Sequence, residues 1–162
     1  MPLTIPPPVD VQLTDEEIFT LLNGVLLGWI PLLFFPYWRF TKSLTLFVAA
    51  VYAILYSVLL LQSLMKSGGE TPDMLTLKGV TNLFKDPEAV LVGWIHYVSY
   101  DLMVARFIVF DAQDSGIPHL LIVVTIPLCL MVGPLGLTAY LFMKLAWTTV
   151  VGTSKPKKEK ST

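Results

Sequence analysis

The chain has 162 residues, of which 54% are hydrophobic and only 14% are charged, and its formal net charge is −1. Soluble domains carry about a quarter charged residues, so this composition excludes an ordinary soluble domain and predicts a single-domain integral membrane protein built of α-helices. The near-zero charge gives no electrostatic basis for binding nucleic acid. The single cysteine, Cys129, cannot form an internal disulfide, and we expect it to be a small buried side chain.

Residues 1–14 are rich in proline and contain no lysine or arginine. We interpret them as a disordered lead without the basic features of a signal or transit peptide. Thr14 and Glu17 have the spacing of a capping box, which predicts that a helix begins at about residue 15. The apolar run at about 18–35, ended by Pro36, predicts the first transmembrane span. Three aromatic residues near its end are interpreted as membrane-surface residues: Trp29, Tyr37 and Trp38.

Three further spans are expected. A second run, at about 44–65, has no charged residue, and the polar segment after it has apolar residues at helical steps. That pattern predicts a short interfacial helix between spans two and three, within 71–88. The third and fourth spans are predicted at about 89–110 and 117–147. Prolines and glycines in the fourth favour a kink or break.

The predicted organisation is a four-helix transmembrane domain over 15–147, followed by a disordered basic tail over 148–162. Four crossings would place both termini and the middle loop on the same side of the membrane. Most lysines belong to that side: Lys66, Lys78, Lys85, Lys155, Lys157, Lys158 and Lys160. The positive-inside rule then predicts that both termini face the cytoplasm, or the stroma of a plastid.

The third span contains His96, Asp101 and Arg106, although a charged residue at a bilayer centre costs about 2.5–3.5 kcal/mol. On a helical wheel His96 and Arg106 share a face with Ser99, whereas Asp101 lies about 140° away. A catalytic interpretation makes His96 and Asp101 a proton donor and acceptor, with Arg106 holding an oxygen. A structural interpretation pairs Asp101 with Arg106 or with tryptophan and tyrosine donors.

A metal site is the third interpretation. The side chains that could bind a metal are those of His96, Asp101, Asp111, Asp114 and His119. Their spacing matches no recognised metal-binding pattern, so no metal ion is predicted.

The segment Gly93-Trp94-Ile95-His96, followed by Asp101, Leu102 and Arg106, resembles the abscisic-acid-deficient-four-like family. Gly133-Pro134-Leu135-Gly136 and the loop at 36–41 also resemble this family, so that the resemblance covers roughly residues 18–145. Its members are small four-helix membrane proteins linked in plants to neoxanthin formation.

The resemblance implies isomerisation of an epoxy-carotenoid, violaxanthin, to neoxanthin. The epoxide opens while a proton leaves an adjacent carbon, giving an allene and a tertiary alcohol, and no redox cofactor is needed. Catalysis is then assigned to His96, Asp101 and Arg106. The expected ligand-binding residues are Trp94, Tyr97, Ser99, Tyr100, Gly133, Pro134 and Gly136.

The membrane expected from this resemblance is the plastid envelope or thylakoid in a photosynthetic eukaryote, and otherwise a plasma or internal membrane. A second hypothesis is a non-catalytic membrane subunit that binds a carotenoid or lipid, or that assembles with a photosynthetic pigment–protein complex.

Overall fold

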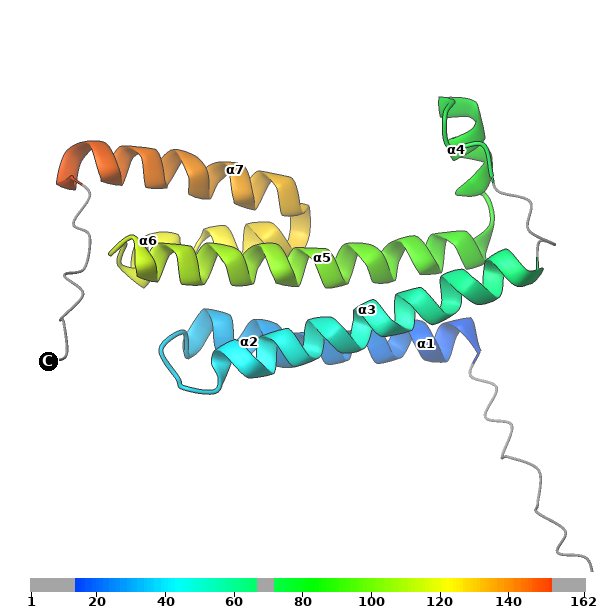
Figure 1. Ribbon diagram of the computed structural model, residues 1–162, viewed down its shortest axis with the longest axis horizontal. Coiled ribbons are helices and arrows are strands. Elements are labelled where there is room, and N and C mark those ends of the chain that lie inside the picture. Colours follow the sequence, from blue (N-terminus) through cyan, green and yellow to red (C-terminus); the bar gives the residue numbers. More distant parts are fainter. Residues whose placement is uncertain (1–13, 67–71, 153–162) are drawn as a thin grey trace, which may run out of the picture.

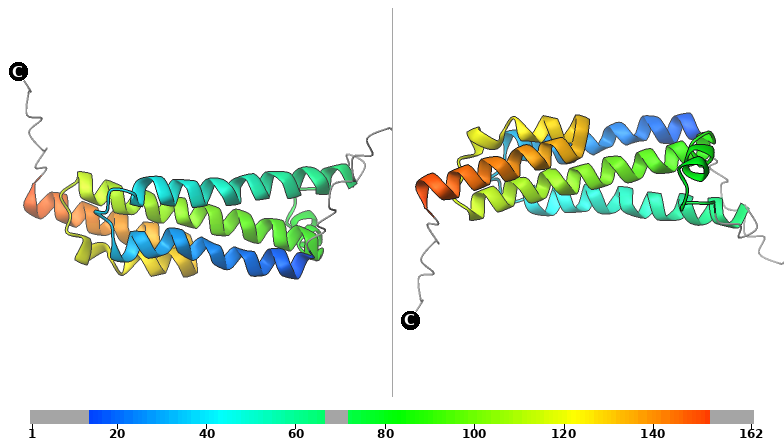
Figure 2. Two further views of the ribbon diagram at one scale, coloured as in Figure 1. Left: turned by 90° about the horizontal axis from the view of Figure 1, so that it is seen from below. Right: turned by 90° about the horizontal axis from the view of Figure 1, so that it is seen from above.

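The computed structural model describes residues 14–66 and 72–152. The predicted lead before residue 14, the break after Lys66 and the tail from residue 153 lie outside these residues. The described chain is an elongated bundle of helices (Figures 1 and 2). In chain order these are α1 (Asp15–Leu21), the 3-10 helix η1 (Leu22–Val25), α2 (Leu26–Phe34), α3 (Thr41–Lys66), α4 (Leu77–Leu83), α5 (Pro87–Asp114), α6 (His119–Ile122) and α7 (Thr125–Val151).

The first three elements follow one another as a single rod. The predicted capping box is confirmed, because Thr14 Oγ1 accepts from the Glu17 N–H (3.3 Å) and Glu17 accepts from the Thr14 N–H (2.8 Å). The rod ends at Phe34. The next residue, Phe35, precedes Pro36, and a residue before a proline disfavours helical geometry. The Thr41 hydroxyl then donates to the Phe35 carbonyl (2.7 Å) and fixes the turn into α3.

Helix α5 is the centre of the bundle. Several of its apolar side chains are completely buried against its neighbours: Ile95, Leu102, Ala105, Ile108 and Val109. In contrast, large apolar side chains on the outer helices point away from the protein, among them Phe47, Ile54 and Phe142. An outer surface of this kind is suited to lipid and not to water.

Three helical stretches, not the four predicted, are long and apolar enough to cross a membrane in the described chain: Asp15–Phe34, Thr41–Lys66 and Thr125–Val151. Helix α5 is long enough but is not among them, since charged residues recur along it from Glu88 to Asp114. The all-α class is therefore confirmed, and three candidate spans are found in the described chain where four were predicted.

Helix α7 is interrupted by a reversal at Val132, whose φ of −149° and ψ of 75° are not helical. A Cβ on Gly136 would lie 2.5 Å from the Cys129 backbone nitrogen. In a straight helix, seven residues span about 10.5 Å along the axis. The chain therefore folds back on itself, and the predicted kink is a helical hairpin whose two arms are visible in Figures 1 and 2.

The two arms of the hairpin run along α5 in opposite directions. The first arm leads from the loop after α5 back to Met131, which contacts Tyr97. The second arm returns, so that Tyr140 and Lys144 contact Asp111 near the end of α5. Consequently α7 enters and leaves the bundle at the same end.

We name the two ends of the bundle by the short helices that lie there. The α4 end contains Thr14, and the α6 end contains the loop at 35–40 and the last residue of α7. Figures 1 and 2 place the first and last described residues at opposite ends of the bundle, whereas four complete crossings would bring residues 15 and 147 to the same end. Helix α7 also continues to Val151, which places residues 148–151 in the helix and not in a tail.

The short helix predicted within 71–88 is observed as α4, which lies across the long axis of the bundle (Figure 1). The Thr76 hydroxyl and the Leu75 N–H donate to Asp73, and they hold the pKa of its carboxyl below its usual value. Thr76 in turn caps the helix by accepting from the Gly79 N–H. These local bonds account for a helix of only seven residues.

The hairpin makes a direct topological prediction. In sealed vesicles, a membrane-impermeant maleimide should label Val150→Cys from the same side as Asp114→Cys and from the side opposite to Glu16→Cys. All three positions are exposed, and the native thiol of Cys129 is fully buried and should remain unlabelled. Labelling of Val150→Cys and Glu16→Cys from one common side would contradict the reversal.

Candidate functional site

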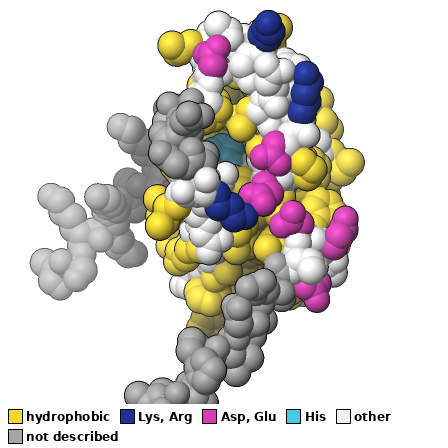
Figure 3. Space-filling view, turned by 90° about the vertical axis from the view of Figure 1, so that its right-hand side faces the viewer, with side chains coloured by type: hydrophobic (Ala, Val, Ile, Leu, Met, Phe, Trp, Pro, Cys, Tyr) yellow, Lys and Arg dark blue, Asp and Glu magenta, His cyan; other side chains and the backbone are white. Residues whose placement is uncertain are grey.

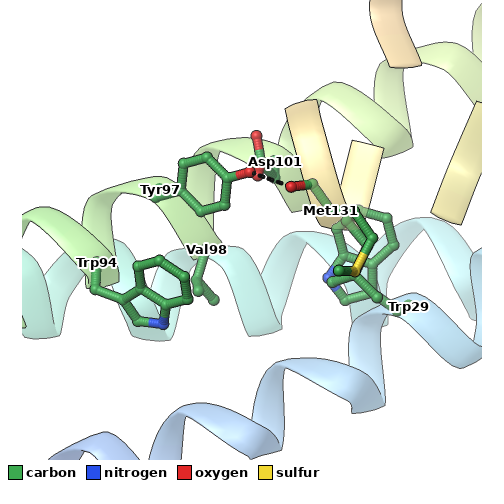
Figure 4. A pocket seen from close by; sticks show the side chains of 7 residues that line it. Trp29, Trp94, Tyr97, Val98, Asp101 and Met131 are labelled. Atoms are coloured by element: carbon green, nitrogen blue, oxygen red, sulfur yellow. Dashed lines mark hydrogen bonds between the residues drawn. The ribbon is translucent and has the colours of Figure 1, made fainter. Parts of the chain in front are cut away.

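The hairpin turn of α7 rests on two side chains that α5 presents one helical turn apart, Tyr97 and Asp101. The Tyr97 hydroxyl donates to the Met131 carbonyl (3.0 Å), and the Asp101 carboxyl lies beside it (Figure 4). A Cβ on Gly133 would stand 2.0 Å from Asp101 Oδ1, so only glycine allows this approach. The reversal frees backbone groups that must find partners inside the protein, and α5 supplies Tyr97 for that purpose.

A cavity of about 230 Å³ opens beside this turn, between α2, α5 and the first arm of α7. It is lined by Trp29, Trp94, Tyr97, Val98, Asp101, Leu130 and Met131 (Figure 4). We call it the Asp101 cavity. Its lining is apolar except for the carboxyl, the phenol and the indole N–H groups.

Trp29 is only 4% exposed, so its predicted place at the membrane surface is wrong. The reason is the close packing of α2 on α5, where a Cβ on Gly28 would lie 2.7 Å from Leu102. This approach turns the neighbouring Trp29 toward the interior. Tyr37 and Trp38, in the loop at the α6 end, are 71% and 50% exposed and keep the exposure expected of surface aromatics.

Two buried polar atoms of the Asp101 cavity residues have no hydrogen-bond partner: Asp101 Oδ2 and Trp29 Nε1. Buried polar groups in proteins are nearly always satisfied, so such atoms call for an explanation. Neither of the two ion pairs in the described chain, Lys66–Glu88 and Lys144–Asp111, involves Asp101. A carboxyl oxygen that accepts and an indole that donates together suit a neutral oxygen group such as a hydroxyl.

His96 is not part of this site. Its ring stacks on Tyr100 (4.4 Å between centroids) and lies 5.3 Å from the Tyr56 ring. It lines a second cavity of about 580 Å³ between α3, α4 and α5, which also includes Phe84 and Gly93. Figure 3, looking onto the α4 end, shows a histidine in a hollow among apolar and charged side chains. The proposed proton exchange between His96 and Asp101 is therefore not supported, and the separation on the helical wheel is confirmed.

Arg106 and Ser99 also face away from Asp101. Arg106 lies over the Phe110 ring (5.2 Å), and the Ser99 hydroxyl donates to the Ala49 carbonyl of α3 (3.2 Å). The structure thus does not form the Asp101–Arg106 pair of the structural interpretation. The structural interpretation also expected a tyrosine beside Asp101, and Tyr97 lies there (Figure 4).

The predicted ligand-binding residues divide into two groups. Trp94, Tyr97 and Gly133 lie with Asp101, the first two in the wall of its cavity and the third against its carboxyl. The others lie elsewhere: Tyr100 against His96, Ser99 against α3, Pro134 on the outer surface and Gly136 against Cys129.

Sequence reasoning missed four residues of the Asp101 cavity: Trp29, Val98, Leu130 and Met131. Val98 lies between Trp94 and Asp101 at helical spacing, and that stripe was a usable signal. Leu130 and Met131 precede the glycine–proline group that breaks α7, but their place follows only from a full reversal. No pattern in the sequence distinguished Trp29 from a surface tryptophan.

The other residues considered as metal ligands are separated or engaged. Asp111 lies in the last turns of α5, where it accepts from the Tyr140 hydroxyl and from Lys144 Nζ (2.6 Å). His119 Nε2 lies 2.9 Å from the Leu33 carbonyl. In residues 14–66 and 72–152, no three histidine, cysteine, aspartate or glutamate side chains are grouped so as to hold a metal ion.

Comparison with known proteins gives one family. A family described as ABA DEFICIENT 4-like matches residues 17–140, which covers most of the chain and includes the Asp101 cavity. Neither curated proteins nor solved structures give a match.

The close contact at Gly133 predicts a large stability effect. Gly133→Ala should destabilise the protein by about 1–3 kcal/mol, because the added methyl group overlaps Asp101. Thermal unfolding in detergent checks this, with Gly93→Ala as the milder control, since its Cβ would only approach the tip of Phe84 (3.0 Å). Adding Asp101→Ser to the Gly133→Ala variant should recover part of the lost stability. Equal stability of Gly133→Ala and the parent protein would refute the close contact between Gly133 and Asp101.

Proposed function

Since the chain belongs to the ABA DEFICIENT 4-like family, we propose that it is a membrane-embedded isomerase of epoxy-carotenoids that converts violaxanthin to neoxanthin. The observation that carries this proposal is the Asp101 carboxyl, buried in an apolar cavity beside the Tyr97 phenol and left with an unsatisfied oxygen. The family connection to neoxanthin supplies the substrate class.

The reaction moves one proton from carbon to oxygen. The C–O bond of the epoxide breaks as its oxygen gains a proton and becomes the tertiary alcohol. The C–H bond on the neighbouring polyene carbon breaks, and its electron pair becomes the second double bond of the allene. Atoms and electrons balance without a redox cofactor.

We assign this proton exchange to Asp101 and Tyr97. Asp101 acts as the base that takes the carbon-bound proton, and the adjacent Tyr97 hydroxyl donates to the epoxide oxygen. Proton transfer between the two then restores the starting state. The Trp29 N–H, which has no partner in the described structure, would donate a hydrogen bond to the substrate oxygen.

The dimensions of the cavity favour binding of one end of the carotenoid. A volume of about 230 Å³ is below the range of about 300–1,000 Å³ typical of sites that enclose a whole ligand. The epoxide-bearing ring would occupy the cavity while the polyene lies along the outer surface. Trp94, at the cavity wall and 47% exposed, would mark the exit toward lipid.

The proposed setting is a membrane of the plastid in a photosynthetic organism. The rod of α1 to α2, α3 and α5 would cross together, with the charges of α5 covered by its neighbours, while the α7 hairpin enters from the α6 end. Arg39, Lys42 and Lys144 belong to elements near that end, and four lysines follow α7 in the sequence: Lys155, Lys157, Lys158 and Lys160. The positive-inside rule then assigns the α6 end to the stroma or cytoplasm.

A binding function without catalysis has its own support. Tyr97 already satisfies the Met131 carbonyl, so these side chains contribute to the hairpin turn without any substrate. In this case the protein would hold a carotenoid or lipid unchanged, alone or within a pigment–protein complex.

Pigment analysis in a bacterial host that makes violaxanthin separates these functions. The parent chain should yield a new allenic product, and Asp101→Asn should lower its yield by about 10²-fold or more, as expected for loss of a general base. Tyr97→Phe should also lower the yield. Chromatography of extracted pigments provides the measurement.

His96→Ala is the matched control, since His96 lines the other cavity of the same helix. It should retain most of the product. Loss of product in His96→Ala but not in Asp101→Asn would overturn the assignment of the site. Violaxanthin recovered unchanged with the purified parent chain would favour the binding function.

A further inference from the structure

Two cations from different helices each contact one aromatic ring toward the α6 end. Lys42 Nζ, in the first turn of α3, lies 4.9 Å from the centre of the Phe110 ring. The guanidinium carbon of Arg106, one turn before Phe110 on α5, lies 5.2 Å from the same centre. Lys42 and Arg106 therefore approach the same ring although they carry like charges.

Neither cation has a carboxylate partner. The ion pairs of the described residues are Lys66–Glu88 and Lys144–Asp111, so Asp111 is already occupied by Lys144. The Arg106 Nε–H is buried without an acceptor. A ring face interacts only weakly with a cation. The N–H groups of Lys42 and Arg106 therefore remain available to a stronger acceptor. This arrangement of donors is suited to an anion.

Hydrogen bonds fix the backbone around the two cations. The Thr41 and Thr45 hydroxyls are buried and bond to backbone carbonyls of the same turn region. Gln113 Nε2 donates to the Pro36 carbonyl (2.9 Å), which ties the end of α5 to the loop before α3. A site that is fixed before binding loses less conformational entropy when its ligand arrives.

The position along the bundle identifies the type of anion. Lys42 stands in the first turn of α3, and Arg106 lies about two turns before the end of α5. Long cationic side chains at such positions can extend to the lipid headgroups. Clefts between membrane helices that carry basic residues bind phosphate headgroups of anionic lipids. A phosphate offers several oxygens, and guanidinium and ammonium groups recognise it well.

We propose that Lys42 and Arg106 form a binding site for the phosphate of an anionic membrane lipid, between α3 and α5 at the α6 end. This inference does not rest on the proposed isomerase activity. It also gives Arg106, which the structure places away from the Asp101 cavity, a role of its own.

The test is lipid binding by the full chain purified in mild detergent, measured by native mass spectrometry with phosphatidylglycerol and phosphatidylcholine. The parent should bind phosphatidylglycerol in preference. Lys42→Gln and Arg106→Gln should each weaken that binding by about fivefold, the effect expected for one headgroup contact. Arg106→Lys retains the charge and should retain most of the preference, which shows that loss in Arg106→Gln is not misfolding.

Lys78→Gln is the control, since Lys78 is an exposed lysine of α4 at the opposite end. It should leave the preference unchanged. Equal binding of the two lipids by the parent, or an equal loss in Lys78→Gln, would overturn the site. Inorganic phosphate added at millimolar concentration should not displace the lipid; full displacement would assign the site to free phosphate and refute the lipid.

Discussion

The reversal of α7 inside the bundle is the constraint on which the rest of the structure depends. A helix that turns back within a membrane exposes backbone groups that lipid cannot satisfy. Here α5 provides Tyr97 for the Met131 carbonyl, and Gly133 allows the Asp101 carboxyl to come within contact. The same contacts create the apolar cavity that Asp101 and Tyr97 line. The residues that allow the turn therefore also form the candidate site.

The three ionisable residues that the sequence singled out in the middle of α5 have three separate surroundings. Asp101 faces the hairpin, His96 lines the cavity beside α4, and Arg106 lies over the Phe110 ring toward the α6 end. A helix that presents each charge to a different neighbour spreads the cost of burying them. It also means that one helix can serve a reaction, a second cavity and the lipid surface without these sites sharing a residue.

The sequence predicted what depends on local pattern. The capping box at Thr14, the stop before Pro36, the short helix before α5 and the angular separation of Asp101 from His96 follow from spacing along one helix, and the structure confirms them. Sequence reasoning failed where long-range packing decides. The Gly133-Pro134 group indicated a break, but whether a break kinks or reverses a helix depends on partners such as Tyr97, more than thirty residues away. The burial of Trp29 likewise depends on the contact of α2 with α5.

Cross-linking between α5 and the second arm of α7 tests the central claim most directly. The Phe107 and Tyr140 rings are 6.3 Å apart, so a short bifunctional maleimide should join Phe107→Cys to Tyr140→Cys. In a straight α7 that runs antiparallel to α5, residue 140 would instead lie near Val90. Efficient linking of the Phe107 pair, with none for Val90→Cys and Tyr140→Cys, is the result that the reversal predicts. The opposite pattern would contradict the hairpin and the site built on it.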